Sequence, residues 1–291
     1  MQKHHAFIIA LFVVYIVATT ALMIKLGIGI APDRYMFVLL ISAVFIKRVK
    51  SFVLDWIPFL FLILSYDWLR GFAGVLNPRV NYLPQLQFDQ IIFGVNPSVW
   101  LQSHIFHPGS LAWYDYTATI FYFLHFALPL AFGYALWLYK RQFFKEFITG
   151  ISLMSYAAWA TYVIFPAAPP WMAAQKGLLT GLTKIMDQTL GAFPAVADLP
   201  TFYHNMNPNM VAAVPSMHAA YPFLVLLFAV SIFGKKGLLF IPYVLGVWFS
   251  VVYLGEHYVS DILSGVLYAI IFFFITIKLI HRKGHRIAKE A

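Results

Sequence analysis

Long apolar segments with few charges fill most of the chain, and they constrain its fold more than any other feature. Eight of them are long enough for an α-helix to cross the hydrocarbon of a bilayer, which takes about 17 to 25 residues. They cover residues 6–25, 28–46, 51–70, 111–139, 144–165, 217–233, 238–255 and 258–280. The second is the weakest, because Pro32, Asp33 and Arg34 interrupt it. The pattern predicts an all-α polytopic membrane protein, a helical bundle of about eight transmembrane helices.

The composition agrees with a membrane protein and limits the side chains that are available for catalysis. Of the 291 residues, 62% are hydrophobic and 11% are charged, against about 25% charged in an average soluble domain. The sequence has no cysteine, which excludes disulfides, zinc–thiolate sites and iron–sulfur clusters, so its chemistry depends on histidine, aspartate and serine. The first apolar segment is as long as a spanning helix and lacks a small-residue cleavage site. We therefore expect it to be retained and not removed as a signal peptide.

The formal charge of +9 is distributed as a topology signal and not as a surface for nucleic acid. If the N-terminus is cytoplasmic, the segments on that side hold 14 of the 20 Lys and Arg residues. These are Lys3, Lys47, Arg48, Lys50, Lys140, Arg141, Lys145, Lys235, Lys236, Lys278, Arg282, Lys283, Arg286 and Lys289. The bias predicts that both termini are cytoplasmic and that the loops at His218 and Glu256 share the extracytoplasmic side. That side is periplasmic or luminal, and the membrane is the inner membrane if the chain is bacterial.

Two of the segments outside the membrane are long. Residues 84–94 within the first, 71–110, carry polar and aromatic side chains at helical spacing, which predicts a helix lying in the membrane interface, with a lid or packed loop as the alternative. The second, 166–215, is rich in Pro, Ala, Gly and Asn and predicts an ordered outer cap with short helices.

Two short polar motifs stand where apolar segments meet polar loops. One is VPSMHA at residues 214–219, and the other is EHYVSD at 256–261. Ionisable groups are costly in a membrane, so two histidines and a carboxylate at helix mouths indicate an enzyme, with two satisfied interfacial histidines as the alternative. His257 and Asp261 are four residues apart, one helical turn, so the carboxylate can orient the imidazole. We predict that His218, His257 and Asp261 are catalytic.

Pro-Ser-x-His followed 39 residues later by His-x3-Asp resembles the second and third signature motifs of the type 2 phosphatidic acid phosphatase superfamily, which includes the vanadium haloperoxidases. The resemblance implies that His257 attacks phosphorus, that Asp261 holds its tautomer and that His218 protonates the leaving oxygen. It implies neither a metal nor another cofactor. Ser216 and the amides of the next helix would hold a phosphoryl oxygen, although Ser216 can also cap that helix. On this basis we divide the chain into N-terminal transmembrane helices with the interfacial segment (1–110), a catalytic helix bundle (111–280) and a basic cytoplasmic tail (281–291).

The sequence departs from the superfamily pattern at the cationic residues that bind phosphate. No Lys-x6-Arg-Pro occurs in the sequence, and Ser250 is followed by Val251 where the family has an arginine. A site without these two cations favours a singly charged phosphodiester over a phosphomonoester or a diphosphate. We therefore expect the substrate to be a phosphodiester lipid.

A second resemblance, from about Asp55 to Gly265, is to the fungal inositol phosphorylceramide synthases and their prokaryotic relatives. Besides the two motifs, it rests on DWIPF at 55–59, YDWLRG at 66–71 and FPAAPPW at 165–171, the last being the most discriminating. It implies transfer of a phosphorylated headgroup, most plausibly inositol phosphate, from a glycerophospholipid donor to the hydroxyl of a ceramide-like acceptor. Trp171 would anchor at the headgroup level or stack on a sugar-like ring, with a plain helix terminator as the alternative.

Further residues are candidates for substrate binding. Arg70 would replace the missing cations, or it would pair with Asp67 or reach a lipid headgroup. Asn207 would read hydroxyl groups or make a turn. We interpret His125 as a hydrogen-bonded packing residue. Lys176, Lys184 and His204 are weaker candidates that we expect to be solvated.

Three other functions remain open at this point. A lipid phosphatase or diphosphatase of the same fold would use water in place of the lipid alcohol, but the missing basic motif argues against it. A non-enzymatic membrane transporter would use the histidines and Asp261 as a proton relay, and clear inverted repeats are lacking in the sequence. A metal enzyme would bind iron through two histidines and a carboxylate. The expected partners are the phospholipid donor, the lipid-alcohol acceptor and the membrane, with no nucleic acid and no inferred partner subunit.

Overall fold

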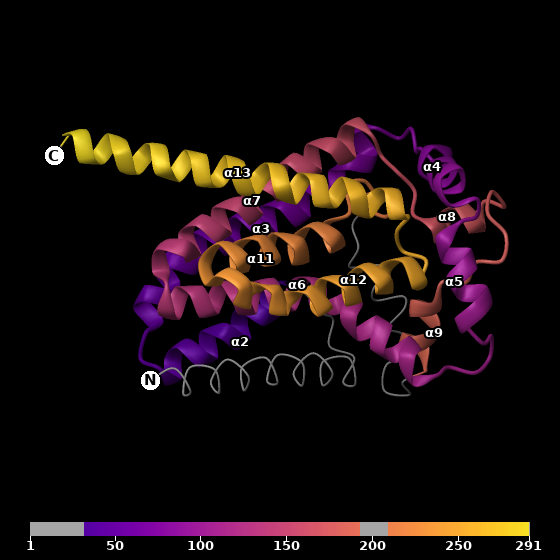
Figure 1. Cartoon of the computed structure of the whole chain (residues 1–291), viewed down its shortest axis with the longest axis horizontal. Helices are drawn as coiled ribbons and strands as arrows, with labels where there is room; N and C mark the ends of the chain where they lie inside the picture. The colour runs from indigo at the N-terminus through magenta and orange to yellow at the C-terminus, as the bar shows by residue number, and fades with distance from the viewer. Residues whose placement is uncertain (1–31, 193–208, 291) are drawn as a thin grey trace.

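The computed structural model describes residues 32–192 and 209–290, and Figure 1 shows their arrangement. The described residues form helices and no strand, with isolated bridges joining Asn81, Ala167 and Ala212. The long elements are α2 (Pro32–Phe45), α3 (Val49–Leu76), α6 (Trp113–Tyr139), α7 (Arg141–Ile164), α11 (Met217–Phe233), α12 (Ile241–Tyr253) and α13 (Val259–Glu290). The short ones are α4 (Leu83–Phe93), α5 (Pro97–Ile105), α8 (Pro170–Gln175), α9 (Ile185–Gly191) and the 3₁₀ helix η2 (Gly234–Phe240).

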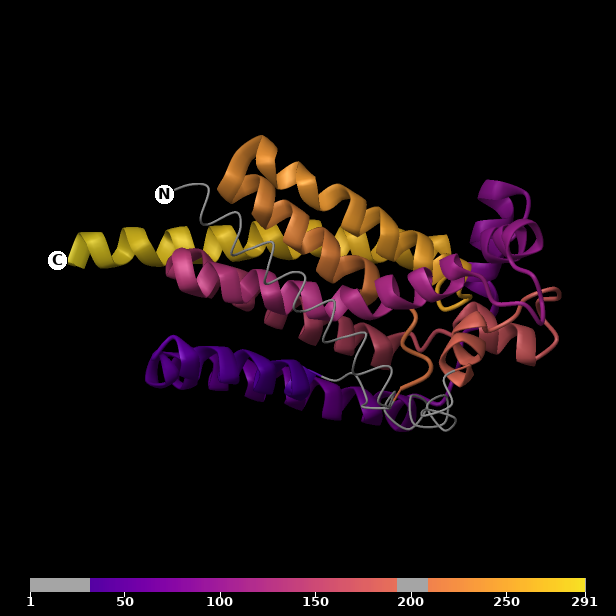
Figure 2. The same ribbon diagram turned by 90° about the horizontal axis from the view of Figure 1, so that it is seen from below.

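The long helices form a bundle that is apolar inside and outside. They run along one another in both views, with α11 packed on α13, α3 on α7 and α6 on α12 (Figures 1 and 2). Large aromatic side chains such as Trp56, Phe144 and Phe228 fill the interior. Outward-facing side chains are equally apolar, with Phe61 70% and Phe274 63% exposed. A helix that is hydrophobic on all sides fits a lipid environment, so this is a membrane protein.

Five stretches in the described part of the chain are long and apolar enough to cross a membrane. They are Val49–Leu76, Trp113–Tyr139, Arg141–Ile164, Met217–Tyr253 and Val259–Leu279. The fourth contains two of the predicted segments, because the chain reverses at η2 between α11 and α12. Gly237 makes this reversal possible, since a Cβ there would lie 2.3 Å from the Val230 nitrogen.

The remaining predicted segments differ from the structure in length or lie outside it. The described part of the second segment is α2, whose 14 residues are fewer than a crossing requires. The first segment, 6–25, lies outside the described residues. The third was predicted to end at Arg70, but α3 continues for one and a half turns to Leu76. The seventh begins later than predicted, because residues 234–240 form η2.

The two ends of the bundle differ in structure and charge. At one end gather α4, α5, α8 and α9, together with the start of α11 and the loop between α12 and α13 (Figures 1 and 2). The turns α2–α3 and α6–α7 and the helix η2 lie at the other end, and these carry the basic residues at 47–50, 140–141 and 235–236. The two polar motifs are therefore at the same end, away from the basic turns. The helix predicted at 84–94 is present as α4.

Candidate active site

His257 lies in the tight loop between α12 and α13, just before the helix begins. Its amide donates to Val251 O at 3.0 Å, and Gly255 turns the chain with a φ of +79°. Asp261 is fully buried in the first turn of α13, where its Oδ2 lies 3.2 Å from His257 Nδ1 and accepts from Tyr258 N at 2.9 Å. The contact predicted from the spacing is present, but the carboxylate reaches back from a helix start to a loop.

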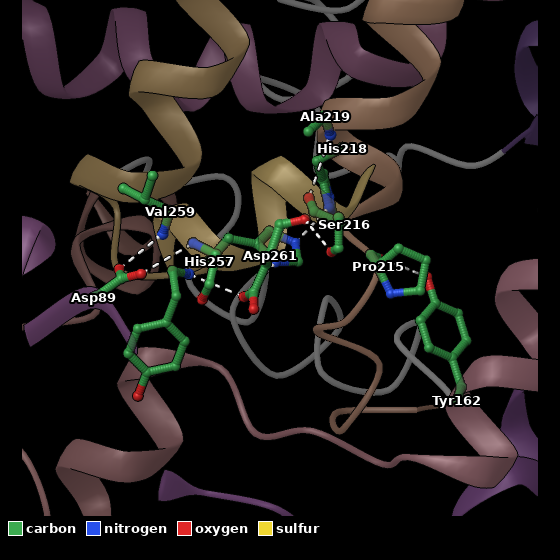
Figure 3. A network of polar contacts seen from close by, with 12 residues as sticks. Asp89, Tyr162, Pro215, Ser216, His218, Ala219, His257, Val259 and Asp261 are labelled. Atoms are coloured by element: carbon green, nitrogen blue, oxygen red, sulfur yellow. Dashed lines mark hydrogen bonds and ion pairs between the residues drawn. The ribbon is translucent and has the colours of Figure 1, made fainter. Parts of the chain in front are cut away.

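His218 comes from the first turn of α11 and meets His257. Ser216 precedes the helix and caps it, its Oγ accepting from Ala219 N at 3.3 Å. His218 Nδ1 lies 3.0 Å from His257 Nε2. Figure 3 shows the two residues with Ser216 and Asp261. The three residues predicted to be catalytic therefore form a continuous chain in the order Asp261, His257, His218.

Main-chain contacts hold the two motifs together. Ser216 N donates to Asp261 O at 3.1 Å, which joins the two motifs directly (Figure 3). The Tyr162 side chain of α7 supports the first motif, since its hydroxyl donates to Pro215 O at 3.0 Å. A Cβ at Gly265 would lie 2.3 Å from Ser216 O, so a side chain there would force α11 and α13 apart. This close approach fixes the position of the start of α11, and therefore of His218, relative to Asp261.

Asp89 supports the same loop from α4, a role that the sequence does not reveal. Its side chain is buried, and its two oxygens accept from Val259 N at 2.8 Å and from Ser260 N at 3.0 Å (Figure 3). Burial raises the pKa of Asp89, against the effect of these hydrogen bonds, which lower it. The carboxylate caps α13 at the position where helix amides lack helical partners.

The hydrogen bonds define where the protons lie in the histidine pair. An ionised carboxylate only accepts, so His257 Nδ1 carries a proton and its Nε2 holds the lone pair. His218 Nδ1 must then donate to His257 Nε2. The site thus has a lone pair and an N–H facing each other, the elements of a nucleophile and an acid. In the described residues no group of three His, Asp or Glu side chains is placed to hold a metal ion, and these three lie in series instead of converging.

The structure brings two of the four predicted binding residues to the histidines, places one beside their loop, and leaves one outside the described residues. Ser216 adjoins His218 as described above. The guanidinium of Arg70 interacts electrostatically with His218 and lies 5.9 Å from the Tyr66 ring. Trp171 is 6% exposed, and its amide donates to Gly255 O at 3.1 Å. Asn207 and His204 lie outside the described residues.

Lys184 was predicted to be solvated, and this was wrong. Its side chain is 9% exposed, its Nζ lies 3.0 Å from Asp187 Oδ1, and the ammonium sits over the Trp171 ring, 4.5 Å from the centroid. The buried ammonium is stabilised by a carboxylate and by an aromatic face. The local sequence does not predict this burial. Lys176, by contrast, is exposed, as predicted.

Two aromatic residues of α6 complete the surroundings of His218. The ring centroid of His218 is 4.0 Å from that of His125 and 4.4 Å from that of Tyr122. His125 Nδ1 lies 2.5 Å from Tyr122 O, so His125 is hydrogen-bonded, as predicted, and its packing partner is a residue of the site. Only the packing of α6 against α11 creates this contact, so no spacing in the sequence could have revealed it.

The sequence of the chain is similar to those of several known proteins. The chain is 29% identical to the phosphoinositol dihydroceramide synthase of Bacteroides thetaiotaomicron, over 88% of this chain and 87% of that protein. It is 25% identical to the inositol phosphorylceramide synthase of Candida albicans, over 94% of this chain and 57% of that protein. It is 27% identical to the inositol phosphorylceramide synthase catalytic subunit of Schizosaccharomyces pombe, over 69% of this chain and 47% of that protein. No solved structure matches.

The match to a family model covers the site and most of the bundle. The model of the PAP2 superfamily aligns with residues 90–275, which include both polar motifs and well over half of the chain. The chain therefore belongs to the PAP2 superfamily.

Proposed function

We propose that the protein is a membrane phosphotransferase that moves inositol phosphate from a glycerophospholipid to the hydroxyl of a ceramide-like lipid. The observation that carries this proposal is the Asp261–His257–His218 chain in a membrane protein of this superfamily. We propose inositol phosphate as the headgroup and a ceramide-like lipid as the acceptor because the names of the relatives contain them. The missing phosphate-clamping cations favour a singly charged phosphodiester donor.

The reaction proceeds in two balanced halves. His257 Nε2 forms a bond to phosphorus while the bond from phosphorus to the diacylglycerol oxygen breaks. That oxygen takes a proton from His218, which enters the step as the imidazolium and leaves it as neutral imidazole. The acceptor hydroxyl then gives its proton to His218, its oxygen bonds to phosphorus, and the nitrogen–phosphorus bond breaks. Asp261 is a positioning residue that keeps the proton on His257 Nδ1 and offsets the positive charge of the ring.

The resting site must open before a substrate enters. An attacking nitrogen, a phosphorus and a leaving oxygen bonded to an acid span roughly 6 Å or more, whereas the two histidine nitrogens are 3.0 Å apart. Two hydrogen bonds hold His257 itself, from its amide to Val251 O and between its Nδ1 and Asp261 Oδ2. Within the described residues, the bond to His257 is the hydrogen bond that holds the His218 ring. The ring of His218 is therefore the part that moves, by about 3 Å.

We propose that three groups hold the phosphoryl oxygens. Ser216 Oγ accepts from Ala219 N and retains its own proton for donation. The amides at the start of α11 add the partial positive charge of a helix N-terminus. Arg70 interacts electrostatically with His218 and compensates in part for the absent superfamily cations. Trp171 and Asn207 remain proposals for headgroup binding.

We further propose an orientation in which the four short helices form an outer cap and α4 lies in the outer interface. The basic turns at the opposite end of the bundle support a cytoplasmic location for that end and for both termini. About eight spans result if the first two apolar segments also cross. The division into 1–110, 111–280 and a tail at 281–291 follows this arrangement.

A labelling experiment tests the orientation. Lys176 follows α8 and Lys235 lies in η2, and both are exposed. Since the sequence has no cysteine, Lys176→Cys in intact cells should react with an impermeant maleimide and Lys235→Cys should react only after permeabilisation. The reverse pattern would place the site in the cytoplasm.

The function is tested with purified protein and phosphatidylinositol labelled in the headgroup, with and without ceramide. A ceramide-dependent labelled lipid is the expected product. Free inositol phosphate as the main product would indicate a hydrolase. Absence of both, with lipid movement across vesicles, would indicate a transporter, and loss of turnover in a chelator would indicate a metal enzyme.

A further inference from the structure

A cavity of about 450 Å³ lies between α8 and the segment that leads to α9. This volume is within the range of small-molecule sites. The lining includes the aromatic Trp171, the polar Gln175 and Thr180, and Lys184. The Trp171 amide is hydrogen-bonded to Gly255 O, two residues before His257. The cavity is thus attached directly to the loop that carries the proposed nucleophile.

Glu256 connects the cavity to that loop. It immediately precedes His257, is 7% exposed, and makes a side-chain hydrogen bond with Trp171 of the cavity wall. In the described part of the chain its Oε1 is buried without a hydrogen-bond partner. A buried carboxylate oxygen that lacks a donor is costly, so its retention here points to a ligand that supplies one.

The chemistry of the lining selects one class of ligand. The wall offers an aromatic face, an ammonium, an amide and a hydroxyl, and the carboxylates of Glu256 and Asp187 lie behind Trp171 and Lys184. This set suits an uncharged ring with many hydroxyl groups, since hydroxyls both donate and accept. Glu256 and Asp187 would repel a free phosphate, and Lys184 would repel a cationic headgroup. The headgroup ring is one oxygen away from the phosphorus that His257 attacks, so it must lie close to this loop.

We propose that this cavity binds the polyol ring of the donor headgroup, with Glu256 accepting from a ring hydroxyl and Lys184 donating to another. The inference rests on the proposed function for the identity of the donor. It assigns headgroup selection to the segment from α8 to α9 and to Glu256. The phosphoryl group itself stays with His218, His257 and Ser216.

Binding can be separated from turnover by working in the inactive His257→Ala protein. Inositol 1-phosphate and myo-inositol are the probes, glycerol 1-phosphate is the control ligand, and the readout is ligand-observed NMR or calorimetry. We expect both inositol probes to bind and glycerol 1-phosphate to bind at least about tenfold more weakly, as loss of hydrogen bonds to charged groups implies. Adding Glu256→Gln or Thr180→Val should weaken inositol binding, about tenfold for Glu256→Gln. Lys176→Met, a nearby exposed lysine, should leave it unchanged.

The pH dependence gives a second readout that a structural role of Glu256 would not produce. Burial raises the pKa of Glu256 to about 7, with Lys184 lowering it and Asp187 raising it. A carboxylate accepts two hydroxyls and its protonated form accepts fewer, so inositol affinity should fall as pH drops through about 7. Glu256→Gln should abolish this dependence. Equal binding by Glu256→Gln and its parent, or equal binding of inositol and glycerol phosphates, would overturn the subsite, whether or not the wild type transfers headgroups.

Discussion

Replacing His257 by alanine should reduce formation of the labelled lipid by at least about 10⁴-fold, as removal of a nucleophile does in other enzymes. The imidazole supplies the lone pair that faces His218, and alanine has none. The amide of residue 257 still bonds to Val251 O, so the loop and the purified protein should remain folded. Turnover of the variant is measured with headgroup-labelled phosphatidylinositol and ceramide, and its folding by size-exclusion chromatography.

His107 provides the matched control, because it is an exposed histidine in the segment between α5 and α6. His107→Ala should retain full activity, and wild-type-like turnover in His257→Ala would exclude His257 as the nucleophile. Asp261→Asn should keep the shape of the site but lose roughly 10³-fold or more, since an amide can set the wrong tautomer. If Asp261→Asn were fully active, the carboxylate would serve only to cap α13.

Substitution of His218 by glutamine should lower transfer from phosphatidylinositol by roughly 10³-fold, within the usual range for loss of a general acid. The diacylglycerol oxygen is a poor leaving group and needs the proton of His218 Nδ1. A nitrophenyl phosphodiester leaves without protonation, so its cleavage should fall much less. The prediction is checked by measuring both substrates with the same preparation of the variant.

The contrast between the two substrates distinguishes the roles of His218. Equal losses on both would indicate that the residue binds the phosphoryl group and does not act as an acid. Tyr122→Leu is a useful comparison, because the Tyr122 ring packs on the His218 ring. It should weaken both reactions to a similar and smaller extent.

The placement of the three proposed catalytic residues could be predicted from the sequence because each lies at one of two helix starts. His257 and Asp261 are one turn apart, and both motifs fall where apolar periodicity stops. Counting the apolar segments and the basic loops between them predicted that both motifs lie at the same end of the bundle. Membrane helices can be recognised by the length of their apolar segments, so α6 and α7 were predicted close to their bounds. The start of α13 was predicted within one residue, but this helix continues to Glu290, ten residues beyond the predicted end at 280.

The supporting residues could not be predicted because packing between distant helices creates their contacts. Asp89 caps α13 across 170 residues of sequence, and His125 meets His218 through the contact of α6 with α11. Neither has a periodic or motif signal. Lys184 was misjudged for the same reason, since its burial depends on Trp171, which α8 places beside it.

The contact between Gly265 and Ser216 has a consequence for how such proteins diversify. It joins the two reactive segments backbone to backbone, so their spacing depends on α11 and α13 and not on the outer helices. The stretch from α8 to α9 reaches the reactive loop through few bonds, chiefly Trp171 N to Gly255 O and Gln102 to Thr183 and Tyr253. If the cavity selects the headgroup as proposed, this stretch can change during evolution, and the lipid specificity with it, while the spacing of His218 and Asp261 stays the same.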